Sequence, residues 1–169
     1  RELRRGHPEV IYCAGKTVAQ VRAIIAALLE GGSNILATRA TPEMAEVVMA
    51  LCPAARYNSL GRTLVIQRNE PLLTPTTIAI VTAGTSDQPV AEEAAETALL
   101  FGNRVERIND VGVAGLHRLL ARLEQIRQAR AIIVVAGMEG ALASVVAGLV
   151  ARPVIAVPTS VGYGANFGG

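Results

Sequence analysis

Aromatic residues and cysteines are scarce in this chain of 169 residues. Only 3% of the residues are aromatic, tryptophan is absent, and the two cysteines, Cys13 and Cys52, show no metal-ligand spacing. Two cysteines do not make a disulfide framework in a chain of this length. We therefore expect both to be small buried hydrophobes in a protein of a reducing, cytoplasmic compartment.

Charge of one sign is also lacking. The 16 basic residues nearly balance the 14 acidic ones, for a formal net charge of +2. Nucleic-acid binding depends on a strong basic field, so this balance argues against DNA or RNA as a partner.

A membrane span and a secretion signal are not expected either. Residues 131–151 carry a single charge, Glu139, but Gly137 and Gly140 divide this apolar stretch into a β-branched run and an alanine-rich run. Such a pattern predicts strand, turn and helix rather than one transmembrane helix. No signal peptide is evident at the start of the sequence.

Hydrophobic residues are abundant, at 51%, and most of them are Ala, Val, Leu and Ile. The patterning predicts a small α/β domain over residues 1–74, with strands at 9–12, 34–38 and 63–66 and helices at 17–30 and 42–51. It predicts a second domain over residues 75–169, with strands at 77–81, 104–108, 131–136 and 154–157 and helices at 89–101, 116–128 and 139–150. Leucines 116, 119, 120 and 123 form an apolar stripe on the second of these helices. The alternation predicts an open, doubly wound, mostly parallel sheet.

Ligands of such sheets bind outside the carboxyl ends of the strands. Four loops of the second domain leave those ends, at residues 83–87, 109–112, 137–140 and 158–164. Gly84, Thr85 and Ser86 offer a bare backbone and two hydroxyls at the start of a helix, which is typical of a phosphate cradle. Capping of the helix by Ser86 or Asp87 explains the same residues equally well.

The other loops carry isolated polar residues. Glu139 stands between two glycines directly after a buried strand, where partial desolvation would suit its carboxyl group to proton transfer. A glutamate in the first turn of a helix is an equally ordinary interpretation. Asp110 is a candidate for a ribose contact or a turn cap, and His117 is more often structural than catalytic. Lys16 lacks the earlier glycine of a P-loop, which argues against a nucleoside triphosphate site there.

Three segments resemble the PurE family of aminoimidazole ribonucleotide carboxylases and mutases. The run Gly-Thr-Ser-Asp at 84–87 is similar to the Gly-Ser-x-Ser-Asp phosphate loop of that family, and residues 136–142 and 153–158 resemble its last strands. PurE has a Ser-Ala-His-Arg-type loop after its second strand, whereas this chain has a different sequence at 109–118. That departure argues against an aminoimidazole substrate.

The chain as a whole is more similar to the LarB family, which begins the assembly of the nickel-pincer cofactor of lactate racemase. The similarity is carried by residues 4–17, 81–87, 110–115, 138–141 and 158–164. It implies carboxylation of the pyridinium ring of nicotinic acid adenine dinucleotide with CO2 or bicarbonate. It also implies hydrolysis of the phosphoanhydride, with release of AMP and with Mg2+ or another divalent metal as cofactor. PurE relatives are octamers, so we expect a homo-oligomer between a dimer and an octamer.

Carried onto this sequence, the resemblance implies Glu139 as the base that removes the ring proton and His117 as a helper acid or base. The substrate contacts that it implies are Gly84, Thr85, Ser86, Asp87, Asp110, Val111, Gly137, Met138, Thr159 and Tyr163. A thiolate that adds to the ring would create the enamine that attacks CO2. In the family this cysteine lies just beyond the segment matching 163–164, so we expect it there in the full protein rather than at Cys13 or Cys52. No metal ligand is assigned. The alternatives are a true PurE-type enzyme and a non-catalytic nucleotide-binding module.

Overall fold

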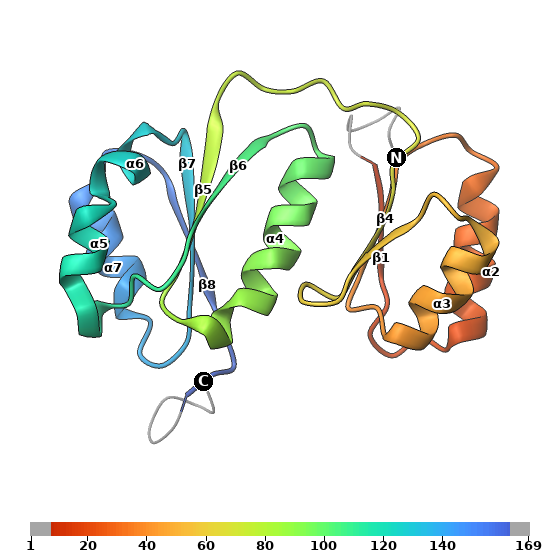
Figure 1. The fold of residues 1–169 in the computed structure, drawn as a ribbon, viewed down its shortest axis with the longest axis horizontal. Helices are drawn as coiled ribbons and strands as arrows, with labels where there is room; N and C mark the ends of the chain where they lie inside the picture. Colours follow the sequence, from red (N-terminus) through yellow and green to blue (C-terminus); the bar gives the residue numbers. More distant parts are fainter. Residues whose placement is uncertain (1–7, 163–169) are drawn as a thin grey trace. The chain divides into compact units, whose positions relative to one another are not determined.

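The computed structural model describes residues 8–162, and the chain divides into two compact units (Figure 1). The first unit comprises Arg1–Leu72 with Leu100–Gly102, and the second comprises Leu73–Leu99 with Asn103–Gly169.

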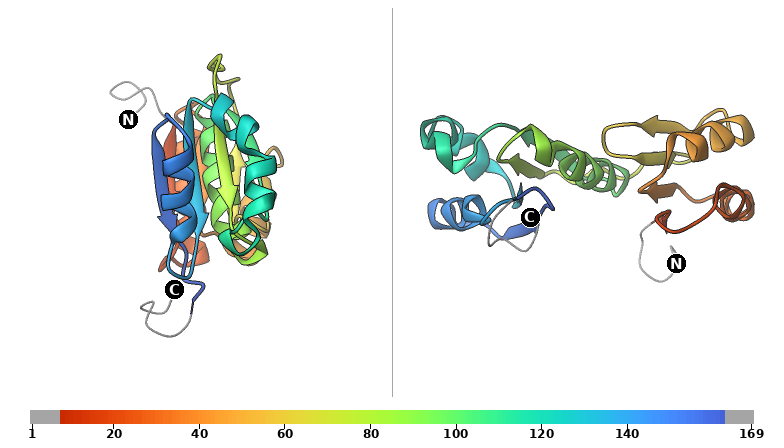
Figure 2. Two further views of the ribbon diagram at one scale, coloured as in Figure 1. Left: turned by 90° about the vertical axis from the view of Figure 1, so that its left-hand side faces the viewer. Right: turned by 90° about the horizontal axis from the view of Figure 1, so that it is seen from below.

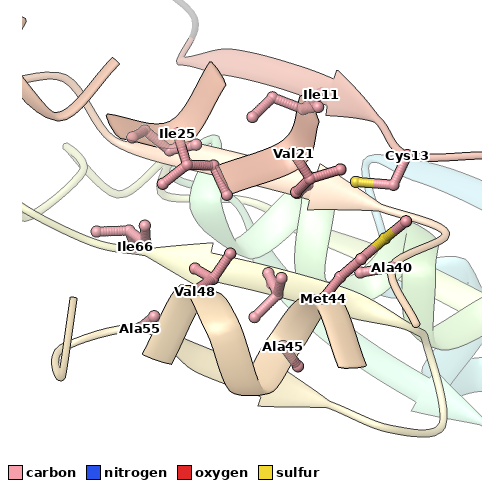
Figure 3. Packing of buried hydrophobic residues seen from close by; sticks show 13 residues of the cluster. Ile11, Cys13, Val21, Ile25, Ala40, Met44, Ala45, Val48, Ala55 and Ile66 are labelled. Atoms are coloured by element: carbon pink, nitrogen blue, oxygen red, sulfur yellow. The ribbon is translucent and has the colours of Figure 1, made fainter. Parts of the chain in front are cut away.

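The first unit is a small four-stranded sheet covered by two helices. Its elements are β1 (Glu9–Tyr12), α2 (Val18–Leu29), β2 (Ile35–Thr38), α3 (Pro42–Leu51), β3 (Arg56–Asn58) and β4 (Thr63–Ile66). The strand order is β1-β2-β4-β3, with β1 parallel to β2 and β4 antiparallel to both of its neighbours. Figure 3 shows Cys13 in the core of this unit, with Val21 and Met44 among the buried side chains around it. Cys13 is thus the buried small hydrophobe that its sequence context predicts, whereas Cys52 is only partly buried.

The second unit is a four-stranded parallel sheet with helices on both faces. Its elements are β5 (Thr77–Thr82), the short 3-10 helix η1 (Thr85–Asp87), α4 (Gln88–Leu100), β6 (Arg104–Ile108), a second 3-10 helix η2 (Val113–Gly115), α5 (Leu116–Ala121), α6 (Leu123–Gln128), β7 (Ala131–Ala136), α7 (Ala141–Leu149) and β8 (Val154–Pro158). All neighbouring strands are parallel and their order is β6-β5-β7-β8. The predicted open, doubly wound parallel sheet is therefore confirmed.

The helices bury the two faces of this sheet unequally. Helix α4 packs on one face, where Ala91 and Ala95 meet Ile80 and Val135. Helices α5, α6 and α7 pack on the other face and contribute Leu119, Ile126, Leu142 and Val146 to a larger cluster (Figure 2). Alternate residues of each strand point to opposite faces, so one β-branched strand such as β7 serves both clusters.

Two predicted helices differ from the structure. The helix expected over residues 116–128 is divided at Arg122, whose φ of −105° and ψ of 3° lie outside the helical region. Of its leucine stripe, Leu119 is fully buried while Leu116 and Leu120 are exposed, so only part of the stripe faces the core. The last helix begins at Ala141 rather than at residue 139.

The late start of α7 has a clear backbone cause. Met138 and Gly140 have φ values of 56° and 69°, in the left-handed region that a right-handed helix cannot use. The segment 137–140 is therefore a turn, closed by a hydrogen bond from the Gly140 amide to the Gly137 carbonyl oxygen at 3.1 Å. Glu139 lies in this turn and not in the first turn of a helix.

Among the described residues, no helix combines the length and the apolar content that crossing a membrane requires.

Candidate functional site

The carboxyl edge of the second sheet contains a topological switch point. From β5 the chain crosses to β6 on one side, then returns past β5 to β7 and β8 on the other side. Loops that leave β5 and β7 therefore diverge and leave a crevice between them, which is where ligands of open α/β sheets bind. The loop after β5 contains residues 84–87, and the loop after β7 contains residues 137–140.

Asp87 connects three loops at this edge. Its side chain is buried, and its Oδ2 accepts a hydrogen bond from the Gly84 amide at 3.0 Å. Its Oδ1 accepts from the Gly137 amide at 3.1 Å and from the Thr159 hydroxyl at 2.8 Å. Hydrogen bonds to a charged partner contribute about 1.5–3 kcal/mol each. The bond to the Gly84 amide matches the capping that the sequence suggests for Asp87. The bonds to Gly137 and Thr159 join residues far apart in the sequence, so no local pattern indicates them.

The turn after β7 is packed closely against the segment after β8. A Cβ atom at Gly137 would lie 2.1 Å from the Val161 carbonyl oxygen and 2.7 Å from Thr159 Oγ1, so only glycine fits at this position. The Met138 amide donates to the same Val161 oxygen at 2.7 Å, and the Thr159 amide donates to the Ala136 oxygen at 3.1 Å. These contacts fix the backbone immediately before Glu139.

Glu139 itself is exposed. The expectation that a position after a buried strand leaves this carboxyl group partly desolvated is therefore wrong. Glu139 stands in a turn between Met138 and Gly140, which both have left-handed backbone conformations. Its place in the turn is nevertheless next to Gly137, which is hydrogen-bonded to Asp87. Glu139 and the loop 84–87 therefore belong to one rim.

The hydroxyls of Thr85 and Ser86 are free at this rim. Both residues are exposed, and neither side chain forms a hydrogen bond within residues 8–162. Gly84 has an extended backbone, with a φ of −152°, and a Cβ atom there would meet no protein atom within 4 Å. Neither its conformation nor its packing requires glycine, so the bare backbone beside two free hydroxyls keeps the phosphate-cradle interpretation open for these residues.

The loop after β6 is bonded to the loop after β5. The amides of Val111 and Gly112 donate to the carbonyl oxygens of Thr82 and Ala83, both at 3.1 Å. The Val111 side chain is buried in the core cluster, and its amide is already paired. Val111, one of the expected substrate contacts, thus presents neither group to the crevice.

The remaining expected residues differ in accessibility. His117 is exposed on α5, and Asp110 is exposed with a φ of 59°. Met138 is partly exposed, whereas Thr159 is buried against Asp87. Tyr163 lies outside the described residues.

Three polar residues at this edge were not expected from the sequence. The Thr82 hydroxyl, which is fully buried, lies 3.1 Å from Asn109 Oδ1 and links the ends of β5 and β6. Arg118 reaches back from α5, and its Nε donates to the Asp110 carbonyl oxygen at 2.7 Å. No local pattern signals these contacts, because each depends on how a strand end or a helix lies against its neighbour.

Apolar groups border the rim as well. A cavity of about 190 Å³ lies beside the β7 turn and is lined by small and branched apolar residues, namely Val134, Ala136, Gly140, Ala143, Ala156, Val157 and Pro158. Within residues 8–162 there is no cluster of three or more His, Cys, Asp or Glu side chains able to hold a metal ion. The described residues therefore offer polar and apolar walls but not a preformed metal centre.

Neither cysteine belongs to the unit that contains this edge. Cys13 and Cys52 both belong to the first unit. Burial raises the pKa of the Cys13 thiol, an effect that the nearby Lys16 ammonium only partly opposes. A buried thiol that holds its proton is a poor nucleophile.

Known proteins match this chain along nearly its whole length. Residues 1–69 match the LarB/PurE-like N-terminal domain, and residues 77–166 match AIR carboxylase. An uncharacterised protein of Methanocaldococcus jannaschii is 40% identical over 177 residues, which cover 97% of this chain and 67% of that protein. The parallel sheet and the second match define a carboxylase-related protein with the PurE fold. Because the first match adds the LarB-type N-terminal domain, the chain belongs to the LarB family within the PurE-like superfamily.

Proposed function

We propose that this protein carboxylates the pyridinium ring of nicotinic acid adenine dinucleotide and hydrolyses its phosphoanhydride, releasing AMP. The observation that carries the proposal is the linkage through Asp87. One carboxylate holds the loop with the free hydroxyls of Thr85 and Ser86 against the turn that bears Glu139. A phosphate-type loop and a carboxylate base are thus fixed at one rim, in a family of carboxylases.

The phosphates of the dinucleotide bind at the loop 84–87 in this proposal. The hydroxyls of Thr85 and Ser86 donate to phosphate oxygens, and the bare backbone of Gly84 allows the ligand to approach closely. The start of η1 and α4 adds a favourable dipole for an anion. The adjoining pyridinium ring then reaches the β7 turn and its apolar cavity.

Glu139 accepts the proton that carboxylation displaces. A nucleophile that adds to the pyridinium ring produces a neutral enamine, and the enamine carbon forms a bond to CO2. Loss of the ring proton from that carbon to Glu139 and departure of the nucleophile restore the aromatic ring. The ring that covers Glu139 removes water from its exposed carboxylate and strengthens it as a base. In this proposal the product is a mononucleotide with one additional carboxylate, a precursor of a nickel-pincer cofactor.

Two components of this reaction come from outside the described residues. Cys13 is buried, and both Cys13 and Cys52 belong to the first unit, so we assign the nucleophilic thiol to neither. Within residues 8–162 no three His, Cys, Asp or Glu side chains lie together so that they could hold a metal ion, and we therefore name no metal ligand. We propose that Mg2+ enters with the phosphates of the substrate, as it commonly does in phosphate chemistry.

Mass spectrometry of the full-length protein with nicotinic acid adenine dinucleotide, bicarbonate and Mg2+ tests the proposal. The expected result is AMP together with a mononucleotide that is one carboxylate heavier. Turnover of aminoimidazole ribonucleotide in place of the dinucleotide would instead establish a PurE-type reaction. Saturable nucleotide binding with neither reaction would establish a binding module.

A further inference from the structure

The amino edge of the second sheet, where its parallel strands begin, carries several arginines. Arg104 is the first residue of β6, Arg130 directly precedes β7, and Arg152 precedes β8 by two residues. Arg127 lies in the last turn of α6. All four residues are exposed. This edge is opposite to the carboxyl edge that contains the candidate site, so none of these arginines belongs to the rim described above.

An open depression of about 620 Å³ lies at this edge. It is lined by Arg127 and Arg152 and by residues 148–151, which connect the end of α7 to β8. Arg127 Nε donates to the Leu149 carbonyl oxygen at 3.1 Å and so holds the end of α6 against the end of α7. The depression therefore has a fixed wall on the side of Arg127, and its lining carries two positive charges and no negative one.

Hydrogen-bond donors remain unused around this depression. Nη1 of Arg127 pairs with Glu124 at 2.8 Å, whereas its Nη2 has no partner among the described residues. The guanidinium groups of Arg130 and Arg152 form no hydrogen bond or ion pair within residues 8–162. The amides of Ala151 and Arg152 donate to no described residue either. The edge thus combines positive charge with donors that a ligand can use.

Capping of helix ends accounts for only one of these arginines. Basic side chains near the C-terminus of a helix can bond to its last carbonyl groups. Arg127 has this role at α7, through its bond to the Leu149 oxygen. Arg130 and Arg152 follow the ends of α6 and α7 but donate to no helix carbonyl. Their guanidinium groups therefore have no capping role in the structure.

Stability of the sheet does not account for Arg130 and Arg152 either. Strands β7 and β8 are neighbours, and their residues Ile132 and Val154 are partners in the ladder. Arg130 and Arg152 each stand two residues before these partners, so two like charges begin adjacent strands that are about 4.8 Å apart. Like charges opposite each other on neighbouring strands destabilise a sheet. A bound anion would remove this repulsion.

We propose that Arg127, Arg130 and Arg152 form a second anion site, which binds the phosphate group of a small molecule at the amino edge of the second sheet. A phosphate monoester carries a charge between −1.5 and −2 near neutral pH, which suits a cluster of three arginines better than a single carboxylate does. The planar fork of arginine matches phosphate oxygens, and its charge-assisted hydrogen bonds are strong. The small residues Gly148 and Ala151 leave the depression open to the ligand. The inference does not depend on the proposed function, because it uses no residue of the opposite rim.

Labelling of the full-length protein with phenylglyoxal, which modifies accessible arginines, tests this inference residue by residue. Peptide mass spectrometry measures the rate of labelling at each arginine with increasing inorganic phosphate or AMP. Both ligands should slow the labelling of Arg130 and Arg152 several-fold and with saturation. Arg122, an exposed arginine between α5 and α6, is the control and should be labelled at an unchanged rate. Sodium chloride at the same ionic strength should not protect, since it only screens charge.

Two variants of opposite sign sharpen the test. Arg152→Gln should raise the phosphate concentration for half-protection of Arg130 about tenfold, as loss of a charged hydrogen bond does, and Arg152→Lys should restore only part of the affinity. Glu124→Gln removes the carboxylate that pairs with Arg127 and should lower that concentration a few-fold.

The source of the phosphate group follows from the two ligands. Protection by AMP at lower concentrations than by inorganic phosphate would assign the site to a nucleotide, and equal concentrations would assign it to phosphate alone. Equal protection by sodium chloride, or an unchanged half-protection concentration in a folded Arg152→Gln variant, would overturn the inference. So would arginines 130 and 152 that resist labelling without any ligand, because another copy of the chain would then cover this edge.

Discussion

The two units differ in how side chains cap the N-terminal ends of their helices. In the first unit, Thr17 and Thr41 accept hydrogen bonds from amides three residues further on, and Gln20 completes a capping box at α2. In the second unit, α5 and α7 begin without a side-chain cap. The carboxylate at the start of α4, Asp87, bonds to residues that are 50 and 72 positions away in the sequence.

This difference is in keeping with a candidate site in the second unit. A local cap satisfies the amides of its own helix and leaves little for a ligand. The N-terminus of α3 also has a carboxylate of its own, Glu43. Hydrogen bonds from the Thr41 hydroxyl and the Glu43 amide lower the pKa of this carboxyl group. Hydrogen bonds between loops that are far apart in the sequence instead fix the shape of a rim, and among the described residues the hydroxyls of Thr85 and Ser86 have no partner.

Replacement of Glu139, the proposed base at the rim of the second unit, should have the largest effect. Glu139→Gln is expected to lower the carboxylation rate about a hundred- to ten-thousandfold, the usual contribution of a general base. Dinucleotide affinity should change little, because the amide keeps the size of the side chain. Rapid-quench assays and calorimetry measure the two quantities, with Glu124→Gln as an exposed control on α6. Equal turnover in wild type and Glu139→Gln would remove this residue from the mechanism.

Loss of the hydrogen bonds that Asp87 accepts should have the next largest effect. Asp87→Ala should lower the free energy of unfolding by about 3 kcal/mol, because it leaves the Gly137 amide and the Thr159 hydroxyl buried without their acceptor. Asp87→Asn keeps one acceptor oxygen and should lose less. Urea unfolding measures both changes. A loss below about 0.5 kcal/mol in the alanine variant would show that the linkage does not hold the rim together.

A local cap should matter less and only to stability. Thr17→Ala removes the side-chain oxygen that accepts from the Gln20 amide at 3.2 Å, and should lower the free energy of unfolding by about 1 kcal/mol. Turnover at saturating substrate should stay at the wild-type level. A variant that is stable but slow would show that the first unit contributes to the reaction.

The smallest expected effect concerns pH and the core of the first unit. Burial raises the pKa of the Cys13 thiol in the folded protein above its value in the unfolded chain. The resulting stability is complete below the unfolded thiol pKa of about 8.5 and is lost as the pH rises through the folded pKa. Urea midpoints measured across this alkaline range should fall more for wild type than for Cys13→Ala. Parallel curves would show that the thiol does not titrate during unfolding.

Much of the architecture was predictable because it rests on short-range patterns. The strands predicted at 104–108 and 131–136 are β6 and β7 with the same bounds, and the helices predicted at 17–30 and 42–51 are α2 and α3, capped by Thr17 and Thr41. Errors arose where backbone conformation overrides hydrophobic pattern, at Arg122 and at the turn that contains Met138 and Gly140.

The site was predictable as a set of loops but not as a set of roles. The rule that parallel strands expose their carboxyl ends at one edge identified the loops at 83–87 and 137–140. The sequence did not predict the partners of Asp87, the exposure of Glu139 or the position of Arg118. The hydrogen bonds of a carboxylate or a guanidinium group depend on which distant segments the fold brings together.

The sequence by itself determined the alternation of strands and helices, the capped helices of the first unit and the loops that meet at the candidate edge, since residue periodicity and bonds within a few positions decide these features. Only the tertiary structure decided which polar groups are already bonded and which remain free for a ligand. The Asp87 carboxylate is hydrogen-bonded to Gly137 and Thr159, whereas within residues 8–162 the hydroxyls of Thr85 and Ser86 and Nη1 of Arg118 have no hydrogen-bond partner. A hydrogen bond requires its donor and acceptor to lie about 3 Å apart, whatever their separation along the chain. Which polar groups are bonded and which are not is therefore decided only when the chain folds.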